Sequence, residues 1–277
     1  MASVDVTTQD GHEYTLRNIQ TDNDSTDGMV DVTPFVTFDS DEAFLVSMTQ
    51  QERFQWTGQV SGGSLSADPD YADDPHTAVA EWVQRFMATV NGSQGEGHTI
   101  EHGVRGMDPI NVVFEDAGWS VSGGERAFAT WNATARRGEG VMVSANETVL
   151  EADPGSEWSL DGVGLGRLRE LRESKRQQIN EVETLLADDP GENLIYSNGG
   201  VVRNVTITGV VTGSADERLA FDNEIKSRAG VDETYTYSSP FPGHELSVMV
   251  DSYDSDLEAG AANQTEYSLE LVEGTKS

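Results

Sequence analysis

Residues 42–60 read EAFLVSMTQQERFQWTGQV, and residues 192–211 read ENLIYSNGGVVRNVTITGVV. The two stretches correspond along their length, with one added residue in the second: Glu42, Leu45, Ser47, Arg53 and Gly58 fall opposite Glu192, Ile195, Ser197, Arg203 and Gly209. Self-similarity at a fixed spacing is the sequence signature of a repeated structural unit. The chain is therefore predicted to contain one unit twice, about 150 residues apart.

The first copy predicts a strand, a helix and three further strands. Phe54, Trp56 and Val60 alternate with polar residues, which is the period of a half-buried strand. Thr77 is a candidate cap for a helix that ends at Asn91-Gly92. The apolar face of this helix holds Val79, Trp82, Val83 and Phe86. Strands are expected at 98–102, 110–114 and 126–135, with a loop at Gly118, Gly123 and Gly124 before the last.

The second copy repeats this order. A strand at 205–210 surrounds Gly209, and Ser214 precedes a helix that turns Leu219 and Ile225 inward and stops at Gly230. Strands follow at 235–237 and 246–250, then a polar loop over 251–263 and a closing strand at 266–272. The competing interpretation is coincidence, since any mixed chain offers a helix between strands. Each copy of about 100 residues is large enough for its own core.

Between the copies, apolar residues recur at three- and four-residue steps, which predicts one helix over 164–187. The candidate assembly residues are the basic residues of this helix: Arg167, Arg169, Arg172, Lys175 and Arg176. In an otherwise acidic protein, such a basic face is expected to meet an acidic partner surface. The alternative is that the helix only spans its own two domains. The expected domains are 1–150, a connector over 151–191 with the long basic helix, and 192–277.

The composition indicates a high-salt cytoplasm. The formal net charge is −32, from 49 acidic against 17 basic side chains. In molar salt the Debye length is about 3 Å, so this self-repulsion is largely screened. The alternative of a disordered acidic chain is disfavoured because five Trp, seven Tyr and nine Phe recur from end to end. The charge also disfavours nucleic acid and anionic membranes as direct binding partners.

Several classes of site are disfavoured by residue type. The chain has no cysteine, which removes disulfides, thiolate catalysis and zinc–thiolate sites. No apolar stretch approaches the ~20 residues of a membrane span, and the first residues do not resemble a signal peptide, so synthesis in the cytoplasm is expected. No nucleophile elbow and no phosphate-binding G-x-x-x-x-G-K pattern occurs. We expect no cofactor, no metal and no enzymatic activity.

Three patterns have a possible chemical meaning. His98-Thr-Ile-Glu-His102 matches the H-x-x-E-H zinc motif, but flanking glycines and Thr99-Ile100 favour a strand, which would turn Glu101 away from both histidines. The glycines over 162–166 resemble a dinucleotide loop, although a flexible helix entry fits them better. The acidic segments 22–27, 68–74 and 251–256 are expected to be solvated loops, with cation binding as the alternative.

The end of the second copy carries a family resemblance. VRNVTITGVVTGSADERLAFDNEI over 202–225, followed by the late strand TEYSLELVEG, resembles the tail-tube-like domains of tailed-virus tails and baseplates. The first copy has the matching strand at 54–60 and closes on FATWNAT, without the final Glu-Gly. The resemblance implies an α+β fold of two tandem tail-tube-type domains, each a β-sandwich or barrel with one flanking helix.

The same resemblance implies a function. Such domains assemble edge to edge into rings around a DNA channel, and two of them in one chain would let a trimer imitate a sixfold ring. The leading hypothesis is a structural tail protein of a virus of a halophilic archaeon, at the tube or baseplate, forming a trimeric or hexameric ring with other tail proteins and DNA as passing cargo. An acidic lumen would let DNA slide.

Two alternatives from other classes remain. One is a halophilic tandem β-domain binding module for sugars or a surface partner, favoured by exposure of Trp119, Trp131 or Trp158 and weakened by their burial. The other is a hydrolase that uses a metal or carboxylates together with His98 or His102.

Overall fold

The computed structural model describes residues 3–8, 11, 13–36, 42–90, 98–102, 109–122, 127–140, 150–151, 157–182, 194–256 and 263–274. This described part is mostly β, with sixteen strands and three helices. Its first half contains β1 (Val4–Thr7), β2 (Glu13–Leu16), β3 (Ile19–Val36), β4 (Glu42–Ser61), α1 (Gly62–Leu65), α2 (Pro75–Ala88), β5 (His98–His102), β6 (Ile110–Ser122) and β7 (Phe128–Arg137). After β8 (Glu139–Gly140) and β9 (Leu150–Glu151) come β10 (Ser159–Leu160), β11 (Val163–Gly164), β12 (Arg167–Val182), β13 (Leu194–Thr212), α3 (Ala215–Lys226), β14 (Tyr235–Ser239), β15 (His244–Asp256) and β16 (Gln264–Glu273).

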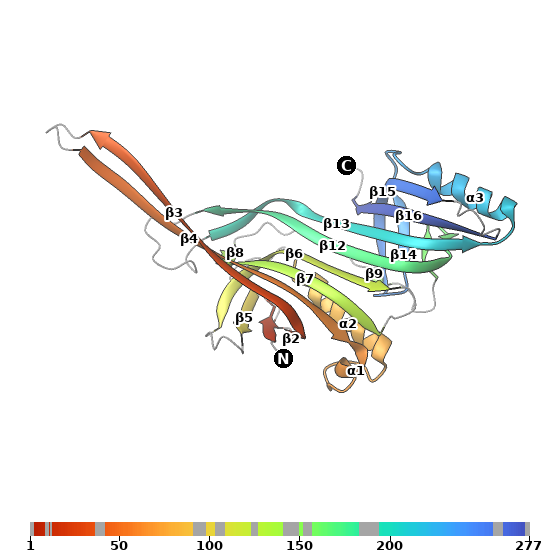
Figure 1. The fold of residues 1–277 in the computed structure, drawn as a ribbon, viewed down its shortest axis with the longest axis horizontal. Helices are drawn as coiled ribbons and strands as arrows, with labels where there is room; N and C mark the ends of the chain where they lie inside the picture. Colours follow the sequence, from red (N-terminus) through yellow and green to blue (C-terminus); the bar gives the residue numbers. More distant parts are fainter. Residues whose placement is uncertain are drawn as a thin grey trace.

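The strand pairing repeats itself along the chain. In the first repeat the neighbours run β3-β4-β7-β6-β5-β1-β2, all antiparallel. In the second repeat they run β12-β13-β16-β15-β14-β10-β11, also antiparallel. The short helix α1 and then α2 follow β4 in the first repeat, and α3 follows β13 in the second (Figure 1). The element order expected from the sequence therefore recurs, and it extends further toward the N-terminus of each repeat than the sequence indicated.

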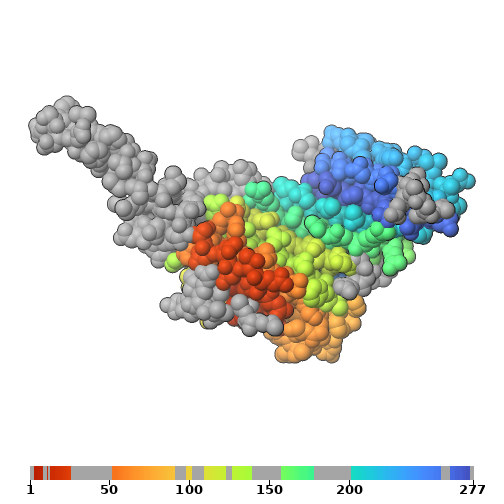
Figure 2. Space-filling model, in the orientation of Figure 1, coloured from red at the N-terminus to blue at the C-terminus, as the bar shows by residue number. Residues whose placement is uncertain are grey.

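The two repeats share one sheet and one core. Strand β12 pairs with β13 on one side and with β6 of the first repeat on the other. The buried apolar cluster runs from Val4 in β1 to Leu271 in β16. Figure 2 shows the C-terminal repeat at one end of the body, directly beside the strands of the N-terminal repeat.

Matching bulges align the two repeats residue by residue. The β6–β7 ladder skips Glu115, and the β15–β16 ladder skips Asp251. The β3–β4 ladder skips Gln20, and the β12–β13 ladder skips Arg169. A bulge leaves one residue unpaired and locally bends its strand, so bulges are fixed features of a fold. Asp116–Ser120 of β6 therefore corresponds to Ser252–Asp256 of β15, and Glu170–Arg176 of β12 corresponds to Thr21–Asp27 of β3.

The aligned glycines of the sequence repeat have the same structural role. Gly58 of β4 pairs with Trp131 of β7, and Gly209 of β13 pairs with Tyr267 of β16. A Cβ atom on either glycine would lie within 3 Å of the aromatic ring that covers it. The Tyr267 hydroxyl also donates a hydrogen bond to the Leu165 carbonyl, at 2.5 Å. Each repeat thus packs an aromatic side chain across a glycine of the adjacent strand.

The predicted helix over 164–187 is wrong. Residues Arg167–Val182 form strand β12, and the connector helix expected within 151–191 is absent from the described residues of that range. Leu165, Leu168 and Leu171 are all buried, and their three-residue steps suggested a helix. The bulge at Arg169 explains the step from Leu168 to Leu171, because one extra residue turns the two-residue step of a strand into three. Leu186 lies outside the described residues.

Smaller predictions also need correction. Helix α2 begins at Pro75 and is capped by Asp74, although its predicted apolar face is buried as expected. In α3 the predicted cap Ser214 is confirmed and Ile225 is buried, but Leu219 is 58 % exposed and Phe221 takes the inward position. Gly118 and the acidic segments 22–27 and 251–256 lie in strands rather than loops, whereas 68–74 is a loop. Gly123 and Gly124 lie outside the described residues.

The long hairpin β3–β4 extends away from the body of the molecule (Figure 1). Its ladder continues from Ile19 opposite Gly58 to Val36 opposite Glu42. The second repeat has a hairpin in the same position, formed by β12 and β13. At about 3.3 Å per residue, an 18-residue strand such as β3 spans roughly 60 Å.

Candidate assembly surfaces

Eight adjacent strands present one continuous polar face. They run in the order β3-β4-β7-β6-β12-β13-β16-β15, and the register places polar side chains of all eight on the same side. We call this side the polar face. One row across it holds Gln59, Thr130, Ser120, Arg172, Thr206, Glu270 and Ser252. A second row holds Thr21, Thr57, Asn132, Gly118, Ser174 and Asn204, and it ends on the apolar residues Val272 and Met249.

Short neutral side chains dominate the polar face, and they interact across strands. The Ser120 and Thr130 hydroxyls lie 2.7 Å apart, and Ser252 donates to Glu270 at 3.0 Å. Arg172 donates to Glu170 of its own strand at 2.7 Å. Charged residues of both signs are interspersed, with Arg53, Arg136, Arg172 and Arg176 alongside Asp116, Glu170, Asp254 and Glu270. In a chain of formal charge −32, this surface is close to charge balance.

The predicted basic residues of β12 divide between its two faces. Arg167, Arg169, Arg172 and Arg176 are exposed, whereas Lys175 is only 2 % exposed. Arg169 forms an ion pair with Glu266 of β16. The five residues therefore do not form one basic face, because a strand turns alternate side chains to opposite sides.

The two repeats meet at a junction that buries both aromatic and charged groups. Residues Asp116–Ser122 of β6 pair with Glu170–Arg176 of β12, and we call this pairing the internal junction. Trp119 of β6 packs edge-on against Phe241 of the second repeat, with ring centroids 5.6 Å apart. Gln177 of β12 donates a hydrogen bond to the Phe114 carbonyl of β6.

A buried charge cluster stands beside the internal junction. Glu173 of β12 accepts from Arg203 of β13 at 2.7 Å and lies 3.1 Å from the His244 Nε2 of β15. All three side chains are almost fully buried. Burial alone would raise the pKa of Glu173, but the charges and hydrogen bonds of His244 and Arg203 outweigh it and lower this pKa to about 2. The carboxylate is therefore ionised across the physiological range.

Besides the outer edges of the short strands β2 and β11, two longer strand edges lack a neighbour in the described part of the chain. Strand β3 pairs there only with β4, and residues Ser252–Asp256 of β15 pair only with β16. We call these the β3 edge and the β15 edge. The counterpart of the β3 edge is the edge of β12 in the second repeat, and the counterpart of the β15 edge is the edge of β6 in the first repeat. These two counterparts pair with each other at the internal junction. An open edge presents unpaired backbone N–H and C=O groups, which is a template for pairing with another chain.

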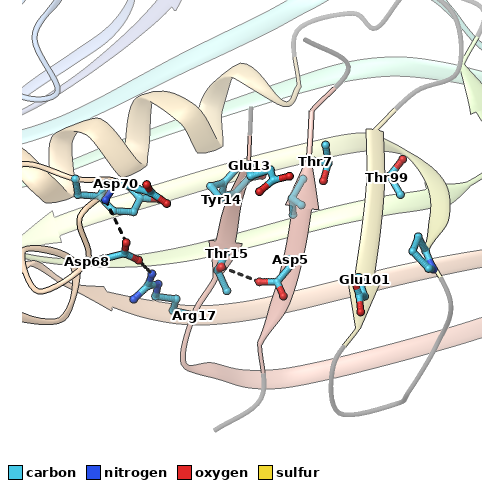
Figure 3. Close-up of a pocket in the computed structure, with 13 residues that line it drawn as sticks. Asp5, Thr7, Glu13, Tyr14, Thr15, Arg17, Asp68, Asp70, Thr99 and Glu101 are labelled. Atoms are coloured by element: carbon cyan, nitrogen blue, oxygen red, sulfur yellow. Dashed lines mark hydrogen bonds and ion pairs between the residues drawn. The ribbon is translucent and has the colours of Figure 1, made fainter. Parts of the chain in front are cut away.

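A polar cavity of about 380 Å³ lies on the outer side of β1, β2 and β5, next to the loop that precedes α2 (Figure 3). Arg17 forms an ion pair with Asp68, and Thr15 donates to Asp5 at 2.7 Å. The backbone N–H of Asp70 and the nearby Arg17 lower the pKa of Asp68. Within the described residues, no group of three or more histidine, aspartate or glutamate side chains is placed to hold a metal ion.

His98–His102 forms strand β5, as the sequence predicted. His98 is buried, and its Nε2 donates to the Thr89 carbonyl at the end of α2, at 2.8 Å. The ring edge contacts Phe114, with centroids 5.8 Å apart. This nitrogen is therefore used in packing β5 against the helix.

The tryptophans named for a sugar-binding module do not form an exposed platform. Trp119 and Trp131 are 3 % and 2 % exposed, and Trp158 is partly buried against the core. Trp131 packs against Trp82 and Phe86 of α2, with centroids about 6 Å apart. Their burial weakens the binding-module alternative.

The sequence did not predict the two edges. No strand was expected over 19–36, where β3 lies, and the strand expected over 246–250 ends six residues before β15 does. The signal was available only by comparison with the other repeat. Asp22 and Asp24 occupy the positions of Leu171 and Glu173, so an apolar alternation is absent from the first half of β3.

Comparison of the sequence with models of known protein families gives no match, and comparison with curated proteins gives none either. Among the described helices, none is both long and apolar enough to cross a membrane.

Proposed function

We propose that this protein is a non-enzymatic structural subunit of the tail of a virus that infects a halophilic archaeon. Copies join edge to edge into a trimeric or hexameric ring around the DNA channel, at the tail tube or the baseplate. The protein is made in the host cytoplasm and resides in the virion tail with other tail proteins. DNA is passing cargo.

The observation that carries this proposal is the internal junction. Two repeats of one topology already join side by side within the chain through β6 and β12. The same two edges recur open in the described residues, as the β15 edge and the β3 edge, at the two ends of the run of eight strands that forms the polar face. A unit that offers different complementary edges at its two ends associates head to tail, which closes into a ring when the rotation allows it. The open edges thus support repeated association.

The polar face is the proposed channel wall. Its serine, threonine, asparagine and glutamine side chains offer hydrogen bonds, and its arginines stand among carboxylates such as Glu170 and Glu270. Strong DNA binding requires basic residues that neutralise several phosphates without such competition. A charge-balanced wall therefore lets DNA pass, and it replaces the acidic lumen expected from composition.

Negative-stain electron microscopy of the purified protein in molar KCl tests the proposal. We expect rings or stacked rings with a central opening, and the protein should be present in purified virions by mass spectrometry. A persistent monomer in molar salt, together with absence from virions, would contradict it. Binding of a glycan or turnover of a substrate at the polar cavity would favour one of the other classes of function.

A further inference from the structure

We infer that the β15 edge of one copy pairs with the β3 edge of a second copy in a fixed register, and that this pairing forms only in concentrated salt. The inference rests on the proposed ring and adds the identity of its contact. It follows from two observations: the residue-by-residue alignment of the repeats, and the charges on the two edges.

The internal junction supplies the register. There, Gly118 stands opposite Ser174 and Ser120 opposite Arg172. The shared bulges align Gly118 with Asp254 and Ser120 with Asp256. They likewise align Ser174 with Ser25 and Arg172 with Asn23. The second copy is therefore placed antiparallel, with its Ser25 opposite Asp254 and its Asn23 opposite Asp256.

The exposure of these residues is consistent with a vacant edge. Asn23, Ser25, Asp254 and Asp256 are all exposed. Three of their counterparts at the internal junction are less exposed: Gly118 is buried, and Ser120 and Ser174 are half-buried. A neighbour on the β3 edge would cover these positions in the way that β6 covers β12.

The charges of the two kinds of junction differ. At the internal junction, β12 contributes Arg172, Lys175 and Arg176 against Glu170 and Glu173, and β6 contributes only Asp116. Positive and negative charges are therefore balanced. At the proposed junction, Ser252–Asp256 carries Asp254 and Asp256, the facing segment 21–27 ends with Asp27, and neither segment has a basic residue.

This difference makes the contact between copies depend on salt. The register places no aspartate directly opposite another, but Asp27 of one copy lies diagonal to Asp254 of the next, at about 7–8 Å between Cα atoms. At that separation two carboxylates repel each other in dilute salt. The Debye length falls from about 10 Å at 0.1 M salt to about 3 Å at 1 M, which removes most of the repulsion between exposed carboxylates. The internal junction, being charge-balanced and partly buried, does not need this screening. Dilute salt should therefore separate copies before it separates repeats.

Cysteine crosslinking tests the register, since the natural chain has no cysteine. The full-length double variant Asn23→Cys/Asp256→Cys is oxidised in molar KCl and analysed on a non-reducing gel. We expect a ladder at multiples of the subunit mass. Mixing the two single variants should give dimers only, and each single variant alone should give none, because unlike edges meet.

Two matched variants control this experiment. Ser120→Cys/Arg172→Cys places the corresponding pair within one chain, so its intramolecular disulfide reports both suitable geometry and an intact fold. Thr21→Cys/Asp256→Cys is shifted by two residues, where diagonal Cα atoms are about 7–8 Å apart, so it should crosslink at least about tenfold less. Absence of the ladder while the intramolecular disulfide forms would overturn the inference, as would equal crosslinking in the shifted variant.

Charge reversal tests the salt dependence. Asp254→Lys/Asp256→Lys replaces two negative charges on the β15 edge with positive ones, one of them diagonal to Asp27 of the neighbouring copy, and we expect assembly at a KCl concentration at least about threefold lower. The matched control Asp70→Lys/Asp73→Lys changes the same charge in the exposed loop before α2 and should leave that concentration almost unchanged. If the KCl concentration needed for assembly fell equally in the edge variant and in the loop variant, net charge would be the cause and the edge assignment would be overturned. Rings without the expected crosslinks would leave the proposed function standing, whereas the expected crosslinks in a protein absent from virions would overturn the function alone.

Discussion

At the scale of single residues, Glu173 holds the interior charges of the second repeat together. Because Arg203 and His244 keep its pKa near 2 instead of 4.5, the folded protein binds this proton less readily than the unfolded chain. The stabilisation is complete above about pH 4.5 and is lost as pH falls toward 2, on the order of 3 kcal/mol in total.

We expect Glu173→Gln to cost about 3–5 kcal/mol at neutral pH, since Arg203 then stays buried without its carboxylate partner. Urea unfolding in molar KCl between pH 3 and 7 measures both effects, and the variant should show a flatter acid limb. Glu170→Gln, which alters an exposed pair with Arg172, should change stability by less than about 1 kcal/mol.

The two glycines that the sequence aligned make a second prediction at this scale. A methyl group at Gly58 or Gly209 would collide with Trp131 or Tyr267, so Gly58→Ala and Gly209→Ala should each destabilise the protein by about 1–3 kcal/mol. Gly63 has open space around its Cα, so Gly63→Ala should be neutral or slightly stabilising. Thermal unfolding in molar KCl compares the three. Equal effects at all three positions would show that the aromatic contact is not the cause.

At the scale of elements, the sequence predicted eight of the sixteen described strands and both longer helices, because each of these follows a plain period. Phe54, Trp56 and Val60 alternate as a strand should, and Val79, Trp82 and Phe86 follow a helical face. Strand β12 could not be predicted in this way, because a bulge at Arg169 imitates helical spacing and because its inward positions after Leu171 are Glu173, Lys175 and Gln177. Those polar residues are buried only because β6, distant in sequence, pairs with β12. The assembly surfaces have the same origin: an open edge is defined by which strands do not pair.

Deletions in β12 test this account of the bulge. Removing Arg169 converts the bulged ladder to a regular one and leaves Leu168 and Leu171 on their present side, so the cost should be about 1–2 kcal/mol. Removing Ser174 shifts every following side chain to the opposite face and should cost more than about 4 kcal/mol or prevent folding. In a helix the two deletions would rotate the chain equally and would have similar effects. Denaturant unfolding of both variants, with circular dichroism as the readout, separates the two cases.

At the scale of the whole molecule, charge governs both folding and assembly, but at different salt concentrations. The continuous core from Val4 to Leu271 must hold together a surface of formal charge −32. Screening weakens this self-repulsion, so we expect the free energy of unfolding to rise steadily between 0.2 M and 3 M KCl. Neutralising exposed carboxylates remote from both edges should lower the KCl concentration at which half of the protein is unfolded by about twofold. The KCl concentration at which half of the protein is assembled into rings should stay nearly unchanged. A suitable set for replacement by the corresponding amides is Glu13, Asp70, Asp73, Glu101, Asp216 and Glu233. Intrinsic fluorescence follows unfolding and analytical ultracentrifugation follows assembly in the same salt series. If both midpoints moved together, one bulk effect of net charge would explain them, and the acidic edges would have no separate role.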